Sequence, residues 1–452
     1  MTCVEELAGF VYKSTFEDLS SRAVEQLKIR VLDALGCAVG ALYSQPVKAI
    51  RELENEFGGS PICTLIGAGK TAPDRAALVN GTLVRYLDFN DSFLSKGETC
   101  HPSDNIAAVL AASEYAGKSG KEFLTALAVA YQVQCRLSEV APVRNKGFDH
   151  VTQGAYAVAA GVSKALGLNE AETANAIAIS GTSLNALRVT RTGKLSNWKG
   201  LAYPFMASCA LNAAFLAKGG ITGPLEVFEG NKGFMDSIAG NFEIDWNKEN
   251  LEAVNSTILK KYNAEIHSQS AIDCLLILRN HEGIRAQDVE SIYVRIFDVA
   301  YNIIGGGEEG EKKLVRTKEE ADHSLPYILS AALIDGEVTP DQYLPQRINK
   351  SDVQSLLGKV KIRPSAEFSI MFPEAVPCEI TVNLIDGRTF TKRVNDYEGF
   401  NTRPIGPRAA AAKFHSLSLS FLDEVKQERI VDDVTHLDQI KVQELVQDLN
   451  FV

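Results

Sequence analysis

The chain has 452 residues, more than one ordinary compact domain holds, so we expect two or three domains. Its hydrophobic content of 45% with 23% charged residues is typical of a folded globular protein. The net charge of -11 argues against a nucleic-acid partner, because phosphate binding requires a basic surface. We identify no apolar run long enough to span a bilayer and no signal peptide, and therefore expect a cytoplasmic protein that does not enter the membrane.

The first 260 residues are predicted to be almost entirely helical. Three expected helix starts combine a cap residue with a carboxylate three positions later: Ser14 with Glu17, Ser119 with Glu122, and Asn169 with Glu172. Many small side chains follow in the apolar runs, which lets helices pack closely. The sequence therefore predicts a tightly packed helical body.

The segment from Leu87 to Asn105 places acids and a histidine against an expected helix start. Another helix should open near Pro73 and lead toward Asp88 and Asp91, which share a face if that stretch is helical. His101 precedes Pro102, the expected start of a helix that runs to Tyr115. Backbone N–H groups at a helix start suit a carboxylate, and the imidazole suits proton transfer, so we predict the floor of an active site here.

The composition changes after about residue 263. We predict strands at 294–297 and 360–363 and a hairpin over 380–394 that turns at Asp386 and Gly387, accompanied by helices at 271–279 and 325–333. From Pro407 the pattern is helical again. The fold class expected is mostly α: a large all-helical domain over 1–263 and 398–452, with a smaller inserted α+β lid over 264–397. We expect a ligand in the cleft between the two domains.

Four of the seven histidines stand in specific polar contexts: His101, His150, His267 and His323. A single histidine is more often structural than catalytic, so their importance depends on what surrounds them. A second concentration of charge spans 187–200 and holds Arg188, Arg191, Lys194 and Lys199 next to Trp198. A solvated loop is one interpretation, but the tryptophan suggests partial burial, and a half-buried arginine needs an anionic partner such as a substrate carboxylate.

Several other chemistries are not supported by the motifs. The eight cysteines include no CxxC pair and are expected to be buried free thiols, with Cys100 beside His101 as the one that could react. No HExxH or GxSxG motif occurs, and the glycine-rich stretch 305–310 is followed and interrupted by charges unsuited to a pyrophosphate. What remains is acid/base chemistry by side chains on a small anionic substrate.

Several ordered motifs resemble the MmgE/PrpD family, which includes 2-methylcitrate dehydratases, cis-aconitate decarboxylases and an iminodisuccinate epimerase. The motifs occur at 88–93 and 101–105, 148–155, 187–200, 220–230, 264–273 and 321–327. The resemblance implies a helical domain with an α+β lid, a homodimer, and catalysis without a metal or organic cofactor. It also places the active-site positions on a set of residues in this chain, namely Asp91, His101, His150, Lys199 and His267, with Arg191 and Tyr327 as further substrate contacts.

The resemblance leads to the hypothesis of a hydro-lyase that acts on 2-methylcitrate in propionate metabolism. His101 and His150 would transfer protons, Asp91 would orient one of them, and His267 would complete the site when the lid closes. Lys199 would hold a substrate carboxylate, as would Arg191 and Arg188. Ser95, a further expected substrate contact, stands where the decarboxylases have threonine, so decarboxylation is less favoured.

Two alternatives stay open at this point. Decarboxylation of cis-aconitate, or epimerisation of a dicarboxylate, would pass through the same kind of carbanion beside a carboxylate. A protein that only sequesters a polycarboxylate would need the same cations but no proton transfer.

Overall fold

The computed structural model describes residues 1–451 and divides the chain into two compact units. The larger unit comprises Met1–Val189, Gly200–Thr257 and the C-terminal residues from Gly406; the smaller unit comprises Thr190–Lys199 and Ile258–Ile405. Residues 258–405 are thus inserted between two parts of the larger unit. The limits differ from the expected 1–263, 264–397 and 398–452, because 190–199 groups with the smaller unit and the return to the larger unit comes at Gly406.

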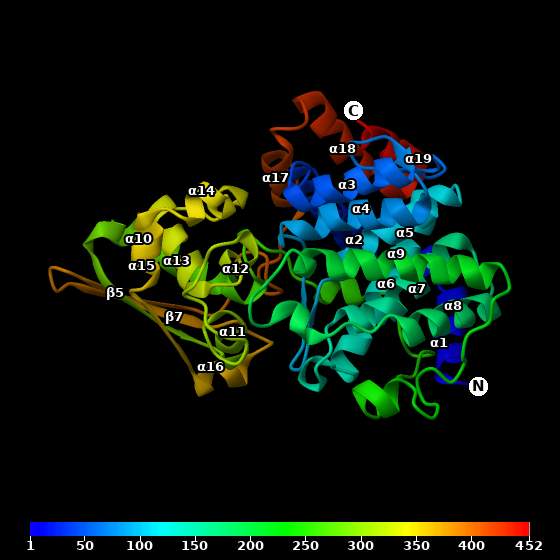
Figure 1. The fold of residues 1–452 in the computed structure, drawn as a ribbon, viewed down its shortest axis with the longest axis horizontal. Coiled ribbons are helices and arrows are strands. Elements are labelled where there is room, and N and C mark those ends of the chain that lie inside the picture. The colour runs from blue at the N-terminus through cyan, green and yellow to red at the C-terminus, as the bar shows by residue number, and fades with distance from the viewer. Residues whose placement is uncertain (452) are drawn as a thin grey trace. The chain divides into compact units, whose positions relative to one another are not determined.

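The larger unit is built mainly from helices (Figure 1). They are α1 Cys3–Lys13, α2 Ser21–Gly40, α3 Gln45–Phe57, α4 Pro73–Tyr86, α5 Ile106–Tyr115, α6 Gly120–Val140, α7 Val151–Leu166, α8 Glu170–Ser183, α9 Trp198–Lys218, α17 Pro407–Ser418, α18 Glu424–Thr435 and α19 Val442–Asp448. Helix α9 begins with two residues grouped with the smaller unit. Two short antiparallel ladders accompany the helices: β1 Cys63–Thr64 with β2 Lys70–Thr71, and β3 Phe93–Leu94 with β4 Thr99–Cys100.

Small residues allow the helices of the larger unit to approach closely, as expected. A Cβ atom added at Gly161 in α7 would lie 2.8 Å from the Cβ of Ala130 in α6. The capping boxes at Ser119 and Asn169 are confirmed. The one expected at Ser14 is wrong, because Thr15 and Asp18 form the box instead and open a single 3-10 turn.

Helix α9 corrects the expectation that no apolar stretch could span a bilayer. It is 21 residues long with a mean hydropathy of 1.4, so by length and composition alone it could cross a membrane. Of its most apolar stretch, 56% is buried inside the protein, as in a core helix of a water-soluble protein. This helix is therefore weak evidence for a membrane segment.

The smaller unit contains a four-stranded sheet in the order β6-β5-β7-β8. The strands are β5 Val289–Ile296, β6 Val360–Pro364, β7 Cys378–Leu384 and β8 Thr389–Val394; β5 pairs with β6 in parallel and with β7 antiparallel. The helices are α10 Gln269–Glu282, α11 Asp298–Ile304, α12 Lys318–Ala321, α13 Leu325–Asp335, α14 Pro345–Ile348, α15 Ser351–Leu357 and α16 Ala366–Met371. Figure 1 shows α10, α13 and α15 along one side of the sheet.

Alternate side chains of the sheet are buried, as the period of a strand requires. In β7 the residues Cys378, Ile380, Val382 and Leu384 are buried, and the residues between them are half-buried. The predicted hairpin is confirmed, with Gly387 at a φ of 89° in its turn. Strand β5 begins at Val289, five residues before the expected start. The first half of the strand contains polar residues that are not buried, so its sequence lacks the apolar pattern by which a strand is predicted.

The start of α6 fixes the C-terminal segment to the larger unit, and a glycine makes this possible. Gly120 donates its N–H to the carbonyl of Ile440 at 2.8 Å, and an added Cβ would lie 1.6 Å from the carbonyl oxygen of Leu437. We expect Gly120→Ala to lower the free energy of unfolding by about 1–3 kcal/mol or more, because the backbone must move apart. Urea unfolding followed by circular dichroism measures this loss.

Gly9→Ala is the matched control for this substitution. Gly9 lies within α1, and its added Cβ meets no atom closer than 4.0 Å. Alanine favours a helix interior over glycine by about 0.5–1 kcal/mol, so this variant should be neutral or slightly more stable. Equal stability of the two variants would contradict the close contact at Gly120.

Candidate active site

The predicted catalytic residues are all buried, with exposed fractions from 0% for Asp91 to 7% for His101. Buried charges and imidazoles require partners, so the partners of each residue show how it is held. His101, His150 and Asp91 belong to the larger unit, whereas Lys199 and His267 belong to the smaller unit.

His101 and His150 lie side by side in the larger unit. Their ring centroids are 5.4 Å apart in an edge-on arrangement, and the ring of Tyr203 lies 6.0 Å from that of His150. His101 follows β4 and precedes the 3-10 turn Pro102–Asn105, which leads into α5, and His150 immediately precedes α7. The structure therefore brings the predicted pair of proton-transfer residues together.

Asp91 contacts His101 through its backbone and not through its carboxylate. The Nδ1 atom of His101 lies 2.8 Å from the carbonyl oxygen of Asp91 and 3.0 Å from the hydroxyl of Ser92. A carbonyl can only accept, so Nδ1 carries the proton in that hydrogen bond, and a neutral His101 has its lone pair on Nε2.

The carboxylate of Asp91 instead caps the turn that follows His101. It accepts hydrogen bonds from the N–H of Ser103 and the hydroxyl of Tyr131, both at 2.9 Å, and lies 3.9 Å from Nε of Arg30. Burial raises the pKa of Asp91, although Arg30 and these hydrogen bonds act in the opposite direction. One N–H of the expected anion-binding helix start is thus already occupied by a side chain.

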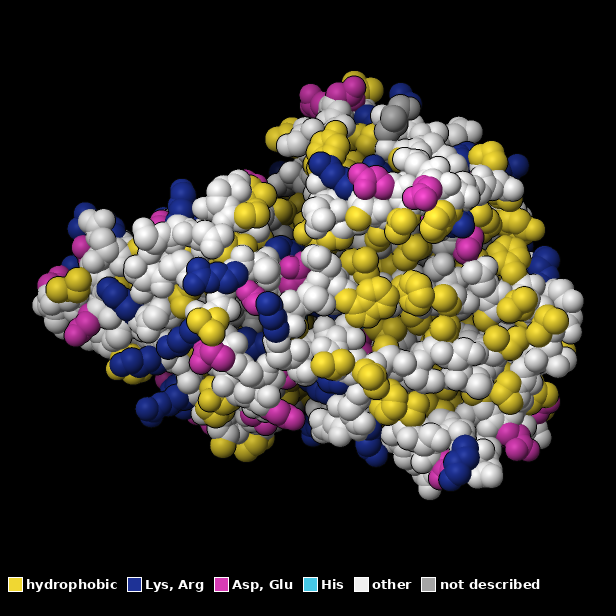
Figure 2. All heavy atoms as spheres, viewed as in Figure 1, with side chains coloured by type: hydrophobic (Ala, Val, Ile, Leu, Met, Phe, Trp, Pro, Cys, Tyr) yellow, Lys and Arg dark blue, Asp and Glu magenta, His cyan; other side chains and the backbone are white. Residues whose placement is uncertain are grey.

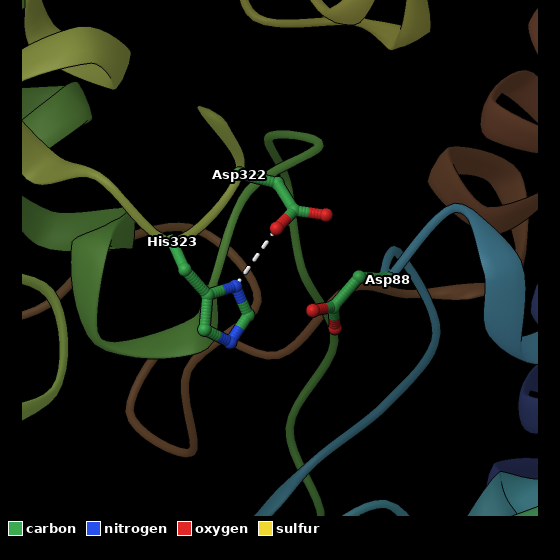
Figure 3. A group of neighbouring side chains, drawn as sticks. All are labelled: Asp88, Asp322 and His323. Atoms are coloured by element: carbon green, nitrogen blue, oxygen red, sulfur yellow. Dashed lines mark hydrogen bonds and ion pairs between the residues drawn. The ribbon is translucent and has the colours of Figure 1, made fainter. Parts of the chain in front are cut away.

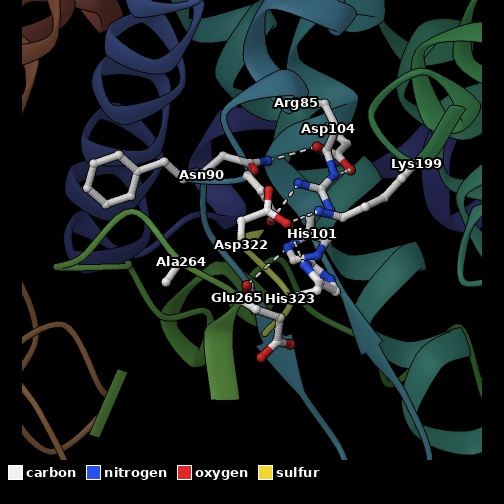
Figure 4. A network of polar contacts seen from close by, with 12 residues as sticks. Arg85, Asn90, His101, Asp104, Lys199, Ala264, Glu265, Asp322 and His323 are labelled. Atoms are coloured by element: carbon white, nitrogen blue, oxygen red, sulfur yellow. Dashed lines mark hydrogen bonds and ion pairs between the residues drawn. The ribbon is translucent and has the colours of Figure 1, made fainter. Parts of the chain in front are cut away.

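Asp88 is also held differently from the expectation. Its φ of 57° is left-handed, so Asp88 and Asp91 do not share a helical turn. The guanidinium of Arg85 pairs with Asp88 at 2.7 Å and with Asp104 at 3.4 Å, and the amide of Asn90 donates to Asp104 at 2.7 Å (Figure 4). This buried network fixes the backbone between α4 and His101.

Two other predicted contacts of the larger unit already have protein partners. Arg188 pairs with Asp149 at 3.3 Å, and the same carboxylate lies 3.6 Å from Nε2 of His150. The hydroxyl of Ser95 lies within hydrogen-bond distance of the carbonyl oxygens of Glu98 and Ser138, at 3.1 and 3.2 Å. Arg188 therefore neutralises the acid beside His150.

In the smaller unit Lys199 is held by Asp322, a residue that the sequence reasoning missed. The Lys199 ammonium donates to Asp322 at 2.7 Å (Figure 4), and Nδ1 of His323 lies 2.8 Å from the same carboxylate (Figure 3). Lys318 also donates to this carboxylate, at 2.6 Å. Burial would raise the pKa of Asp322, but these groups hold it far below its usual range. A carboxylate and an imidazole are also metal ligands, but two adjacent ammonium groups oppose a further cation here.

His267 has a carboxylate partner that the sequence reasoning also missed. Its Nδ1 lies 2.6 Å from Glu265, and the other oxygen of Glu265 accepts the backbone N–H of His267 at 2.8 Å. Burial would raise the pKa of Glu265, but His267, His323 and Lys260 lower it to about 2. Glu265 is therefore ionised throughout the physiological range.

Arg191 and Tyr327 complete the predicted set in the smaller unit. Arg191 is buried, and one guanidinium nitrogen donates to the carbonyl of Lys199 at 3.3 Å, so it supports the backbone at the start of α9. Tyr327 lies in the hydrophobic core of this unit, and its hydroxyl donates to the carbonyl of Gln342. Trp198 is 46% exposed and Lys194 is exposed, so only part of the loop is buried.

The sequence contained a signal for the missed acids. A carboxylate stands one or two residues before three of the candidate histidines: Asp149 before His150, Glu265 before His267, and Asp322 before His323. In each pair the structure places the carboxylate within 3.6 Å of a ring nitrogen.

The two low carboxyl pKa values predict acid sensitivity of the smaller unit. A carboxyl whose pKa is lower in the folded state stabilises the fold above its unfolded pKa, and this stability is lost as the pH falls. For Glu265 the loss should run from about pH 4.5 to about pH 2. Urea unfolding monitored by Trp198, in a variant with Trp246→Phe, should show a falling midpoint over this range, whereas a constant midpoint would contradict the shift.

Comparisons with known proteins agree with the family resemblance. The MmgE/PrpD N-terminal domain matches residues 5–247, and the MmgE/PrpD C-terminal domain matches residues 262–439. The chain is 25% identical to cis-aconitate decarboxylase of Mus musculus over 463 residues, covering 97% of this chain and 91% of that protein. It is 28% identical to the mitochondrial 2-methylcitrate dehydratase of Yarrowia lipolytica over 397 residues (81% and 73%). It is 26% identical to 2-methylcitrate dehydratase of Escherichia coli over 418 residues (85% and 83%). The chain belongs to the MmgE/PrpD family.

Proposed function

We propose that the protein eliminates water from a citrate-like tricarboxylate, converting 2-methylcitrate to 2-methyl-aconitate by side-chain acid/base catalysis. The chain is an enzyme of the lyase type, as its relatives named 2-methylcitrate dehydratase support. The observation that carries the proposal is the buried, adjacent pair of His101 and His150, since imidazoles are the most frequent general acids and bases in enzymes.

The reaction requires one group to accept a proton and another to donate one. A base removes the proton on the carbon next to a carboxylate, the electron pair forms the carbon–carbon double bond, and the β-hydroxyl leaves as water after it is protonated. Negative charge accumulates next to a carboxylate that is already charged, so fixed cations must stabilise it. We propose His101 and His150 for the two proton transfers.

Lys199 and Arg191 are proposed to bind substrate carboxylates. The hydrogen bond from the Lys199 ammonium to Asp322 orients this side chain, and a lysine ammonium is a common partner of carboxylates. Arg188 is proposed to contribute by neutralising Asp149 beside His150. We propose that His267 also takes part in catalysis and that no metal or organic cofactor does.

Product analysis tests this function. The purified protein is incubated separately with 2-methylcitrate, citrate and cis-aconitate, and the products are identified by NMR. We expect 2-methyl-aconitate from 2-methylcitrate. Carbon dioxide released from cis-aconitate would instead show the reaction named for the relative from Mus musculus, to which the chain is similar over 97% of its length. Binding without any product would show a sequestering protein.

We further propose that the enzyme works as a homodimer in the cytoplasm. Figure 2 shows hydrophobic side chains gathered over α9 and its neighbours in the larger unit, and Phe205 and Leu216 of α9 are each 50% exposed. Exposed apolar patches of this kind mark protein interfaces. Light scattering after gel filtration should give twice the chain mass of 49.1 kDa, whereas a single chain mass would exclude the dimer.

A further inference from the structure

Glu265 holds His267 at two points at once. One carboxylate oxygen lies 2.6 Å from Nδ1 of the ring, and the other accepts the backbone N–H of the same histidine at 2.8 Å. A hydrogen bond to the ring and one to the main chain of one residue fix the side-chain rotation as well as its position. Glu265 therefore fixes the orientation of the imidazole of His267.

The main chain of Glu265 is itself held by two hydrogen bonds. The N–H of Glu265 donates to the carbonyl of Asp322 at 3.1 Å, and its own carbonyl accepts the hydroxyl of Ser268 at 2.6 Å. Phe297 and Phe372 cover the histidine ring, each with its centroid 5.8 Å away. These apolar rings exclude water from a charged hydrogen bond, which strengthens it.

The charges around Glu265 keep it an acceptor. His267, His323 and Lys260 lower the pKa of Glu265 although burial alone would raise it, and both Lys260 and His267 are buried. An ionised carboxylate accepts hydrogen bonds and donates none. The proton between Glu265 and His267 consequently belongs to Nδ1 of the histidine.

His101 has the same tautomer but a different partner. Its Nδ1 donates to the neutral carbonyl of Asp91, whereas Nδ1 of His267 donates to a full negative charge. A carboxylate behind an imidazole stabilises the imidazolium that forms during proton transfer, and a carbonyl does so less. Glu265 thus gives His267 a carboxylate partner at Nδ1, where His101 has a backbone carbonyl.

We infer that Glu265 is the positioning residue of His267: it fixes the proton on Nδ1 and thereby makes Nε2 the ring nitrogen that carries the lone pair. This inference rests on the proposed function for its catalytic part. Its structural part, the tautomer, belongs to the resting enzyme and is independent of the substrate. Glu265 takes the part that the sequence analysis expected Asp91 to play for a histidine.

The test combines NMR of the resting enzyme with kinetics. Proton–nitrogen correlation spectra of nitrogen-15 histidine-labelled full-length protein distinguish the protonated ring nitrogen, and His267→Ala identifies the signal. We expect Nδ1 of His267 to be protonated in the wild type and the proton to shift partly to Nε2 in Glu265→Gln, whose single amide oxygen cannot serve both N–H groups. The variant should lose about 10–100-fold in kcat with little change in KM, as for other residues that orient a catalytic group.

Two further variants keep the test decisive. Glu265→Asp retains the charge and should recover part of the Nδ1 signal and of kcat. Asp335→Asn removes another ion-paired carboxylate of the smaller unit, one that Arg347 holds at 2.8 and 3.0 Å, and should change neither. A wild-type His267 protonated on Nε2, or an unchanged spectrum and kcat in Glu265→Gln, would overturn the inference. If 2-methylcitrate is not a substrate, the proposed function fails while the NMR result still decides the tautomer.

Discussion

Replacing His101 with alanine should lower kcat for water loss from 2-methylcitrate about 10²–10⁴-fold, the range that a positioned acid or base contributes. The imidazole is buried, and its Nδ1 is fixed by the carbonyl of Asp91 and the hydroxyl of Ser92, so the ring is held in one orientation. Steady-state kinetics measures the loss, and circular dichroism establishes that the fold is kept.

The control is His281→Ala, because His281 is an exposed histidine near the end of α10. This variant should retain the wild-type kcat. If His101→Ala still turns over within a few-fold of the wild type while folded, His101 does not transfer a proton in the reaction.

Because His150 lies next to His101, a double variant can test whether the two histidines act together. If the two histidines act in one proton-transfer sequence, their effects are not additive. The double variant His101→Ala with His150→Ala should then lose little more activity than the more damaged single variant. Multiplicative losses would show that the two residues act independently.

Asp322→Asn should destabilise the smaller unit by about 3–5 kcal/mol, the cost of leaving a buried charge without its partner. The neutral amide removes the charge that balances both Lys199 and Lys318, and the side chains of Lys199 and Asp322 are 3% and 0% exposed. Urea unfolding followed by Trp198 fluorescence measures the loss. Activity should fall as well, because Lys199 loses the hydrogen bond that orients it.

Asp352→Asn is the matched control in the same unit. Its side chain is 48% exposed and pairs with Arg347, so its removal should cost at most about 1 kcal/mol. A loss for Asp322→Asn that is no larger than that of Asp352→Asn would contradict the described role of Asp322.

Short sequence patterns correctly predicted the structural features that depend on neighbouring residues, such as helix caps and a hairpin turn. The helix starts at Ser119 and Asn169 depend on a side chain three residues away, and the hairpin at Gly387 depends on its turn residues and on alternation in β7. By contrast, the polar residues at the start of β5 concealed half of a strand whose pairing is made by distant strands. Elements held together by long-range contacts were therefore the less predictable ones.

In the candidate site, too, the contacts between residues far apart in the sequence could not be predicted. The motifs indicated the histidines, but not that Asp91 would bind His101 through its carbonyl, which depends on the backbone path after the left-handed Asp88. Asp322 and Lys199 are separated by 123 positions, so no spacing could connect them. The contact between Glu265 and His267 could have been predicted from the sequence, because the two residues are only two positions apart.

The central claim is that side chains alone carry out the elimination, and the most direct measurement is turnover of 2-methylcitrate by enzyme freed of metal ions. The purified protein is dialysed exhaustively against a chelator, its metal content is checked by mass spectrometry, and formation of the new double bond is followed by ultraviolet absorbance. The account predicts the same kcat before and after metal removal. A rate that falls to background and returns when a divalent cation is added would contradict it.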